Sequence, residues 1–143
     1  MILPRNTSRP YTLYMLMALV VFQGLSGIFG GIGLVVDPTG ATLQIPLEWL
    51  SGSPFPDYLV PGIVLLLVLG IYPLAVFYGL FKRNQLAWYG SLLLGIALMI
   101  WLGVEIIVIG YKPDPPLQAV YGTVGILILV CTMLPAVKGH LLL

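Results

Sequence analysis

Residues 11–36 read YTLYMLMALVVFQGLSGIFGGIGLVV, a run that contains no charged side chain. A helix rises about 1.5 Å per residue, so about 20 apolar residues cross the roughly 30 Å hydrocarbon core of a bilayer. The run is longer than the apolar core of a cleaved signal peptide, and no A-x-A-like cleavage site interrupts it. It therefore predicts a membrane-spanning helix.

Three further segments have the same character. Residues 60–81 and 116–137 carry no charge, and residues 86–111 carry only Glu105. The 143-residue chain is 59% hydrophobic and 8% charged, with a mean hydropathy of +1.06, whereas a soluble domain has about 25% charged residues. We therefore predict a single all-α integral membrane domain over residues 1–143. Its fold would be an antiparallel four-helix transmembrane bundle with helices at about 11–36, 60–81, 86–111 and 116–137.

The basic residues predict which way round the bundle lies. Five of the six Lys and Arg residues fall on one side of the predicted bundle, and Lys112 falls on the other. An excess of Lys and Arg marks the cytoplasmic side of a membrane protein. We therefore expect a multi-pass protein of the cell (inner or plasma) membrane, with cytoplasmic N- and C-termini. The five residues are Arg5, Arg9, Lys82, Arg83 and Lys138.

The connection at residues 37–59 is predicted to be a structured extracytoplasmic loop. Asp37, Pro38 and Gly40 stand where a type I turn favours Asp, Pro and Gly. Flanking apolar residues make a short β-hairpin plausible there, and Pro46 would begin one helical turn over residues 46–50. The loop is either a compact cap over the helix ends or a lid for docking or for a ligand.

Glycines recur within the predicted spans. Gly27 and Gly31 form a GxxxG pair in the first helix, where small residues allow close approach between helix backbones in lipid. A dinucleotide-binding loop would need a preceding strand, which this context lacks. Helix packing is therefore the preferred interpretation, and it extends to the further glycines of these helices: Gly24, Gly103, Gly110, Gly122 and Gly125.

Glu105 is the one acid inside a predicted span. Counting from the turn between the third and fourth helices predicts that Glu105 hydrogen-bonds Tyr121 or Gln118, with Trp101 on the same face of its helix. Intramembrane acids are functional by default, as proton relays, ion sites or counter-charges. The alternative is a structural hydrogen bond between helices. Gln23 and Tyr72 form a second possible polar pair near mid-membrane.

Enzyme chemistry finds no support in the sequence. There is no HExxH, CxxC or phosphate-binding loop, the only histidine is His140 near the C-terminus, and the only cysteine is Cys131. Metal sites need three or four ligands, and a net charge of +1 gives no reason to expect nucleic acid. We therefore expect no catalytic residue, no metal and no cofactor.

Four motifs carry a resemblance to a known group. GLVVDPTG, SPFPDYLVPG, WLGVEIIVIGY and LQAVYGTVG, in this order, resemble the pattern of a family of small uncharacterised prokaryotic integral membrane proteins with four helices. The similarity covers the end of the first helix through the fourth. It implies a four-span fold in a bacterial or archaeal membrane, and it implies no activity.

Three functions remain open from the sequence. The first is a non-enzymatic accessory, scaffold or assembly subunit that associates through glycine faces, as a homo-oligomer or within a larger membrane complex. The second is a small oligomeric transporter or channel subunit that uses Glu105 as its proton- or cation-coupling carboxylate. The third is a binder of a lipid or quinone-like ligand near Trp101, Glu105 and Tyr121.

Overall fold

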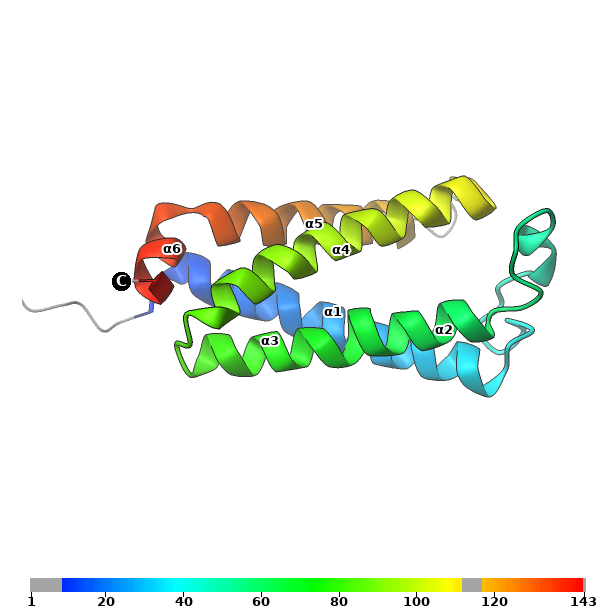
Figure 1. Cartoon of the computed structure of the whole chain (residues 1–143), viewed down its shortest axis with the longest axis horizontal. Helices are drawn as coiled ribbons and strands as arrows, with labels where there is room; N and C mark the ends of the chain where they lie inside the picture. Colours follow the sequence, from blue (N-terminus) through cyan, green and yellow to red (C-terminus); the bar gives the residue numbers. More distant parts are fainter. Residues whose placement is uncertain (1–8, 112–116, 143) are drawn as a thin grey trace, which may run out of the picture.

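The computed structural model describes residues 9–111 and 117–142, and every described element is a helix or a turn. Figure 1 shows an elongated bundle in which the long helices run up and down its length. The elements are α1 (Tyr11–Val36), the short 3-10 helix η1 (Leu47–Leu50), α2 (Leu59–Leu66), the π-helical segment η2 (Leu67–Ile71), α3 (Tyr72–Phe81), α4 (Leu86–Ile109), α5 (Leu117–Met133) and α6 (Pro135–Leu142). The all-α prediction is confirmed.

Three helices are long and apolar enough to cross a membrane: Tyr11–Val36, Leu59–Phe81 and Leu86–Ile109. The fourth predicted span, at 116–137, is wrong as one straight helix. It is divided into α5 and α6, which meet at an angle of 62°, and it makes a fourth span only if the bent pair is taken together. Pro135 accounts for the break, because it has no N–H to donate and its ring would clash with the carbonyl four residues earlier.

The second span contains an internal irregularity that the predicted helix at 60–81 does not include. Residues 67–71 are π-helical, and the N–H of Tyr72 donates to the carbonyl of Leu67. Pro73 follows at the start of α3 and has no N–H for the carbonyl of Leu69. A single widened turn is a common adjustment inside helices. Here it joins α2 and α3 into one apolar span without a sharp bend.

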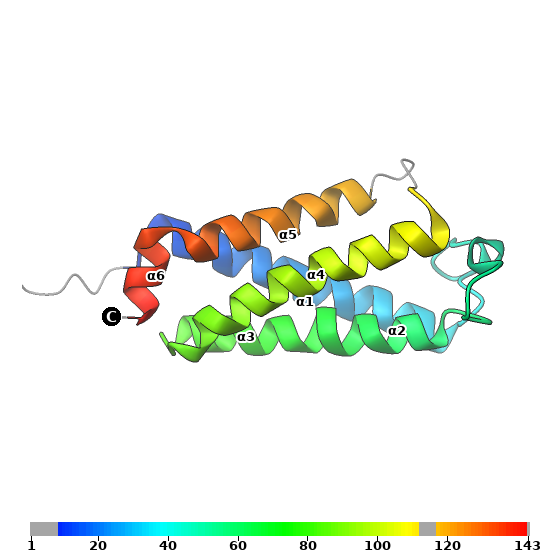
Figure 2. The same cartoon turned by 45° about the horizontal axis from the view of Figure 1, so that its top comes forward.

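The helices pack around one elongated core. α1 lies against α2, η2 and α3 along one side and against α5 on another, while α4 packs mainly on α5 and on α3. Figure 2 shows the crossing of α1 beneath α4 and α5. Leucines predominate in the centre, and six of them are at most 1% exposed: Leu13, Leu16, Leu69, Leu80, Leu94 and Leu98.

The loop at residues 37–59 is structured, but it contains no strand anywhere in its described length, so turns take the place of the suggested β-hairpin. The N–H of Gly40 donates to the carbonyl of Asp37 at 3.0 Å, which is the turn that the sequence predicts. η1 follows Pro46, as expected. Tyr58 is 5% exposed and holds the loop together through two bonds. Its N–H donates to the carbonyl of Pro38 at 2.9 Å, and its hydroxyl donates to the carbonyl of Pro46 at 2.7 Å.

Charge separates between the two ends of the bundle. The start of α1, the α3–α4 turn and α6 meet at one end, and the loop lies at the other (Figure 1). The described cations lie at the first end and the loop acids at the second. Between the ends, apolar side chains face outward; Phe29 is 74% and Ile107 84% exposed. A helical surface of this kind needs an apolar surrounding. The cations are Arg9, Lys82, Arg83 and Lys138, and the acids are Asp37, Glu48 and Asp57.

Candidate functional site

Glu105 lies one helical turn from the end of α4, against the start of α5. The side-chain amide of Gln118 hydrogen-bonds the Glu105 carboxylate. The same amide donates through Nε2 to the carbonyl of Gly110 at 3.1 Å, and Gln118 is 7% exposed. One amide group therefore ties α5 both to the acid and to the backbone just beyond α4, across residues 112–116, which lie outside the described residues.

Of the two predicted partners of Glu105, the structure places Gln118 in contact with it. Tyr121 lies one turn further along α5, where its ring stacks on that of Phe22 of α1, with centroids 5.9 Å apart. Trp101 packs on the main core, one turn before Glu105 on α4. Tyr121 and Trp101 therefore join helices through apolar contacts in this part of the bundle.

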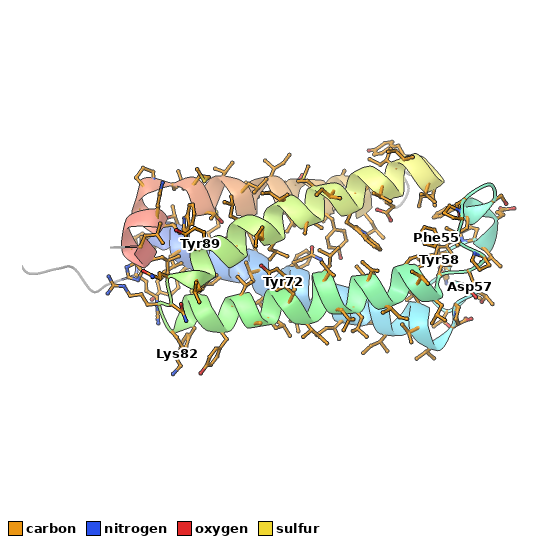
Figure 3. All side chains as sticks on the ribbon, viewed as in Figure 1. Phe55, Asp57, Tyr58, Tyr72, Lys82 and Tyr89 are labelled. Carbon is orange, nitrogen blue, oxygen red and sulfur yellow. The ribbon has the colours of Figure 1, made fainter. Side chains whose placement is uncertain are left out.

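Tyr58 of the loop lies close enough to Glu105 for the charge of Glu105 to raise the pKa of Tyr58. Burial, and then the negative charge of Glu105, raise the pKa of Tyr58 to about 12. Around Tyr58 a second apolar cluster covers the loop end of the core, with Leu34 and Leu50 at its centre and Val108 and Ile109 of α4 against it. Figure 3 shows Tyr58 and Phe55 at this loop end of the molecule. The loop is therefore a packed cover over the Glu105 region.

The turn at the start of the loop is fixed by its own acid. Asp37 accepts hydrogen bonds from the Thr39 hydroxyl at 2.6 Å and from the Thr42 hydroxyl and N–H at 2.8 and 3.0 Å. These donors, the Thr39 hydroxyl first, lower the pKa of Asp37 to about 2. Gly40 has φ +80°, and a Cβ there would lie 2.4 Å from the carbonyl oxygen of Ile45, so only glycine fits. Asp37 and Gly40 are thus turn-forming residues.

Gln23 and Tyr72, the suggested second polar pair, each bond a backbone carbonyl instead of one another. The Gln23 amide donates to the carbonyl of Leu69 at 3.2 Å, which is the carbonyl that Pro73 leaves without its usual helical donor. The Tyr72 hydroxyl donates to the carbonyl of Gly90 at 2.7 Å and so joins α3 to α4 (Figure 3). Gln23 is 1% exposed, which makes this a buried polar contact at the level of the π-helical segment.

The glycines of α1 form a close interface with the second span. A Cβ at Gly27 would lie 2.0 Å from the Leu69 carbonyl oxygen, and one at Gly31 would lie 2.7 Å from the Leu66 Cα. A Cβ at Gly24 would meet the side chain of Leu74 at 2.7 Å. The backbones can therefore approach to this distance only because these positions lack side chains.

The remaining predicted glycines behave in three ways. Gly125 lies against Met99, whose sulfur would be 2.8 Å from a Cβ, and Gly122 has only ordinary contact with Leu102 at 3.8 Å. Gly103 and Gly110 meet nothing within 4 Å in the described part of the chain. Gly110 instead ends α4 with φ +80°. Since no described residue of this chain packs on Gly103, the predicted helix packing there stays a prediction and would need a helix of another molecule.

A lateral groove of about 560 Å³ opens between the π-helical segment and α4. Its walls are apolar except for Tyr72, whose hydroxyl is already bonded to Gly90. Glu105 is not among its lining residues; its carboxylate contacts Gln118 of α5 instead. The groove is lined by Leu67, Val68, Tyr72, Leu93, Ile96, Ala97 and Ile100.

Sequence reasoning missed two features of this region. One is Tyr58, whose only sequence signal was a tyrosine just before an apolar run, next to a loop acid. The other is the carbonyl of Leu69, for which Pro73 was a local signal: a proline inside a predicted span releases the carbonyl four residues earlier. The sequence did not reveal that Gln23, 46 residues away from Leu69, would supply the donor.

Within residues 9–111 and 117–142 no group of His, Cys, Asp and Glu side chains is arranged to hold a metal ion. No family model, curated protein or solved structure matches this chain.

Proposed function

We propose that this chain is a non-enzymatic multi-pass membrane protein that acts as an accessory, scaffold or assembly subunit. The observation that carries the proposal is the bonding of Glu105. Intramembrane acids pair with neighbouring groups in either role, and a structural acid has its partner on an adjacent helix. Here Gln118 bonds the carboxylate from α5, while the same amide bonds the Gly110 carbonyl, so the pair connects two helices.

The proposed location is the cell membrane, with both termini on the cytoplasmic side. The separation of Arg9, Lys82, Arg83 and Lys138 from the loop acids supports this orientation, since Lys and Arg are retained on the cytoplasmic side. A C-terminal fluorescent fusion should fluoresce, and a C-terminal alkaline phosphatase fusion should be inactive. Active phosphatase at the C-terminus would contradict the orientation.

Association through α4 is part of the proposal. Gly103 sits inside a helix, where glycine costs about 1 kcal/mol relative to alanine, and its surroundings within the described chain are open. Small residues are the usual contact points between helices in lipid. We expect Gly103→Leu to leave the folded yield unchanged but to abolish the oligomer or complex found by cross-linking in membranes. An unchanged cross-linking pattern would contradict association through this face.

Glu105→Gln separates the scaffold role from transport, because it keeps hydrogen bonding to Gln118 and removes titration. We expect Glu105→Gln to retain the folded yield in mild detergent and Glu105→Leu to reduce it. Liposomes containing the wild-type protein should show no more proton or cation flux than empty liposomes. A flux that Glu105→Gln removes would establish the small transporter or channel in place of the scaffold.

A lipid- or quinone-like ligand is the second candidate, and the lateral groove supports it. Its volume of about 560 Å³ lies in the range of small-molecule sites, about 300–1,000 Å³. Glu105 does not line the groove, so such a ligand would be held by apolar contact. Ala97→Leu should fill the groove and reduce the retention of a co-purified ligand in organic extracts of the protein.

A further inference from the structure

The basic end of the bundle, formed by Arg9, Lys82, Arg83 and Lys138, collects charges from three places in the sequence. No acidic residue is present in the described segments that meet there: the start of α1, the α3–α4 turn and α6. The described residues of these segments therefore bring four cations to one end without an acidic side chain among them. Such a surface attracts anions from its surroundings.

Two of these cations flank one aromatic ring. The guanidinium carbon of Arg9 lies 4.9 Å from the centroid of the Phe81 ring, and Lys82 Nζ lies 5.9 Å from the same centroid. Arg9 also donates to the Phe81 carbonyl at 2.7 Å, which satisfies a backbone acceptor at the end of α3. Lys82 is exposed, and Figure 3 shows it projecting away from the bundle at this end. Both cations are thus held at the same helix terminus.

The other two cations join α6 to the rest of the bundle. Arg83 donates through Nε to the carbonyl of His140 at 2.8 Å, and Lys138 Nζ lies 5.4 Å from the Trp88 ring centroid. These contacts hold α6 across the end of the bundle, to which the 62° bend directs it. Arg83 and Lys138 therefore add positive potential, while Arg9 and Lys82 are the two cations that share one aromatic ring.

Exposed aromatic side chains indicate the depth of Arg9 and Lys82 in a surrounding bilayer. Tyr78 is 64% exposed, Phe81 47% and Tyr89 52%, all near the same end. Exposed tyrosines at the end of an apolar span belong at headgroup level, where amphipathic rings collect. Arg9 and Lys82 therefore stand at the depth of lipid phosphates rather than in the hydrocarbon or far out in water.

We propose that Arg9 and Lys82 bind the headgroup phosphate of an anionic phospholipid of the leaflet at the basic end. This inference rests on the proposed membrane function and adds a lipid class to it. A guanidinium and an ammonium form charge-assisted hydrogen bonds to phosphate oxygens. Phosphatidylglycerol carries net negative charge, whereas phosphatidylcholine has its own cation beside the phosphate. The site therefore selects the anionic lipid.

The test compares two lipids with the same acyl chains, phosphatidylglycerol and phosphatidylcholine, added to detergent-purified protein. Native mass spectrometry counts the lipid retained, and thermal unfolding measures the stabilisation. We expect tighter retention and a larger rise in Tm with phosphatidylglycerol. Each cation near an anionic lipid surface contributes about fivefold in affinity, so Lys82→Gln should weaken retention about fivefold and Arg9→Gln/Lys82→Gln further.

The matched control is Lys112→Gln, which makes the same change in net charge. In the sequence Lys112 stands between the end of α4 and the start of α5, away from the segments that form the basic end. We expect this control to retain the preference for phosphatidylglycerol. Because Arg9 also bonds the Phe81 carbonyl, Lys82→Gln alone serves if the double variant unfolds.

Three results would overturn the inference: equal retention of both lipids by the wild type, an undiminished preference in Lys82→Gln, or an equal loss in Lys112→Gln. The last result would mean that net charge alone attracts the lipid. None of these would affect the multi-pass proposal. Recovery of the chain from the soluble fraction of cells would overturn the multi-pass proposal itself.

Discussion

The second span makes two contacts of opposite kinds, one with α1 and one with α4. Toward α1, Gly24, Gly27 and Gly31 allow the helices to approach until a Cβ at Gly27 would lie 2.0 Å from a backbone oxygen. Toward α4, Leu67 and Val68 on one side and Leu93 and Ile96 on the other leave a lateral groove. Small residues therefore allow close packing on α1, and larger side chains leave the groove toward α4.

The difference follows from the medium. In lipid there is no hydrophobic gain from joining two apolar helix faces, since the acyl chains are equally apolar. Helices therefore close up where small residues give dense packing and backbone contact, and they stay apart where branched side chains meet. The π-helical segment serves both sides, because it directs Leu69 and Gly70 to α1 and Leu67 and Val68 to the groove.

The strongest test of this comparison is Gly27→Leu. A Leu side chain cannot be accommodated next to the carbonyl of Leu69, so α1 and the second span must separate along their length. Overpacking typically costs about 1–3 kcal/mol, and a clash with backbone belongs above that range. We expect little or no monodisperse folded protein in mild detergent, measured by size-exclusion chromatography and thermal unfolding.

Gly103→Leu is the matched control, with the same substitution in a long apolar helix. Nothing in the described chain lies within 4 Å of a Cβ there. Leu also favours a helix over Gly by up to about 1 kcal/mol, so the control protein should unfold at the same temperature or higher. Equal damage from both substitutions would show that bulk in a span, rather than the α1 interface, is what destabilises the protein.

The sequence was sufficient where the structure depends on local composition. Uncharged runs located α1 and the second and third spans to within two residues, and Asp37 with Gly40 predicted the turn that begins the loop. It was insufficient where a group bonds a backbone carbonyl from a distant segment. Gln23 and Tyr72 are both polar and both near mid-span, so pattern alone paired them, but each bonds a carbonyl of a different helix.

Proline was the local signal that pattern reading passed over. Pro135 divides the last helix and turns α6 across the basic end, although the residues around it are apolar enough to continue a span. Pro73 has the milder effect of a single widened turn. The same residue type breaks one helix and only adjusts another. Pro73 has Gln23 beside the carbonyl that it leaves without a helical donor, whereas the carbonyl four residues before Pro135, that of Cys131, accepts from the N–H of Leu134 at 3.3 Å.

A double-mutant cycle tests the link between Gln23 and Pro73. Gln23→Leu removes the donor to the Leu69 carbonyl at nearly constant volume, and we expect a loss of about 1 kcal/mol in unfolding free energy. Pro73→Ala supplies an N–H four residues after Leu69. In that background Gln23→Leu should cost less, giving a measurable interaction energy. An identical cost in both backgrounds would mean that Gln23 does not compensate for Pro73.

The smallest expected effect concerns the loop end of the bundle, where the charge of Glu105 acts on Tyr58. Its pKa is raised from 10.0 to about 12, first by burial and then by the charge of Glu105. Because the folded-state pKa exceeds the unfolded value, the stability from neutral Tyr58 is complete below about pH 10 and is lost as the pH rises toward 12. Carbon-13 NMR of labelled tyrosine rings, assigned with Tyr58→Phe, should show this late titration.

Glu105→Gln should lower the midpoint of the Tyr58 titration slightly, because burial remains while one negative charge is removed. A midpoint near 10 in the wild type would instead place Tyr58 in water, and the loop would then not be a packed cover over Glu105.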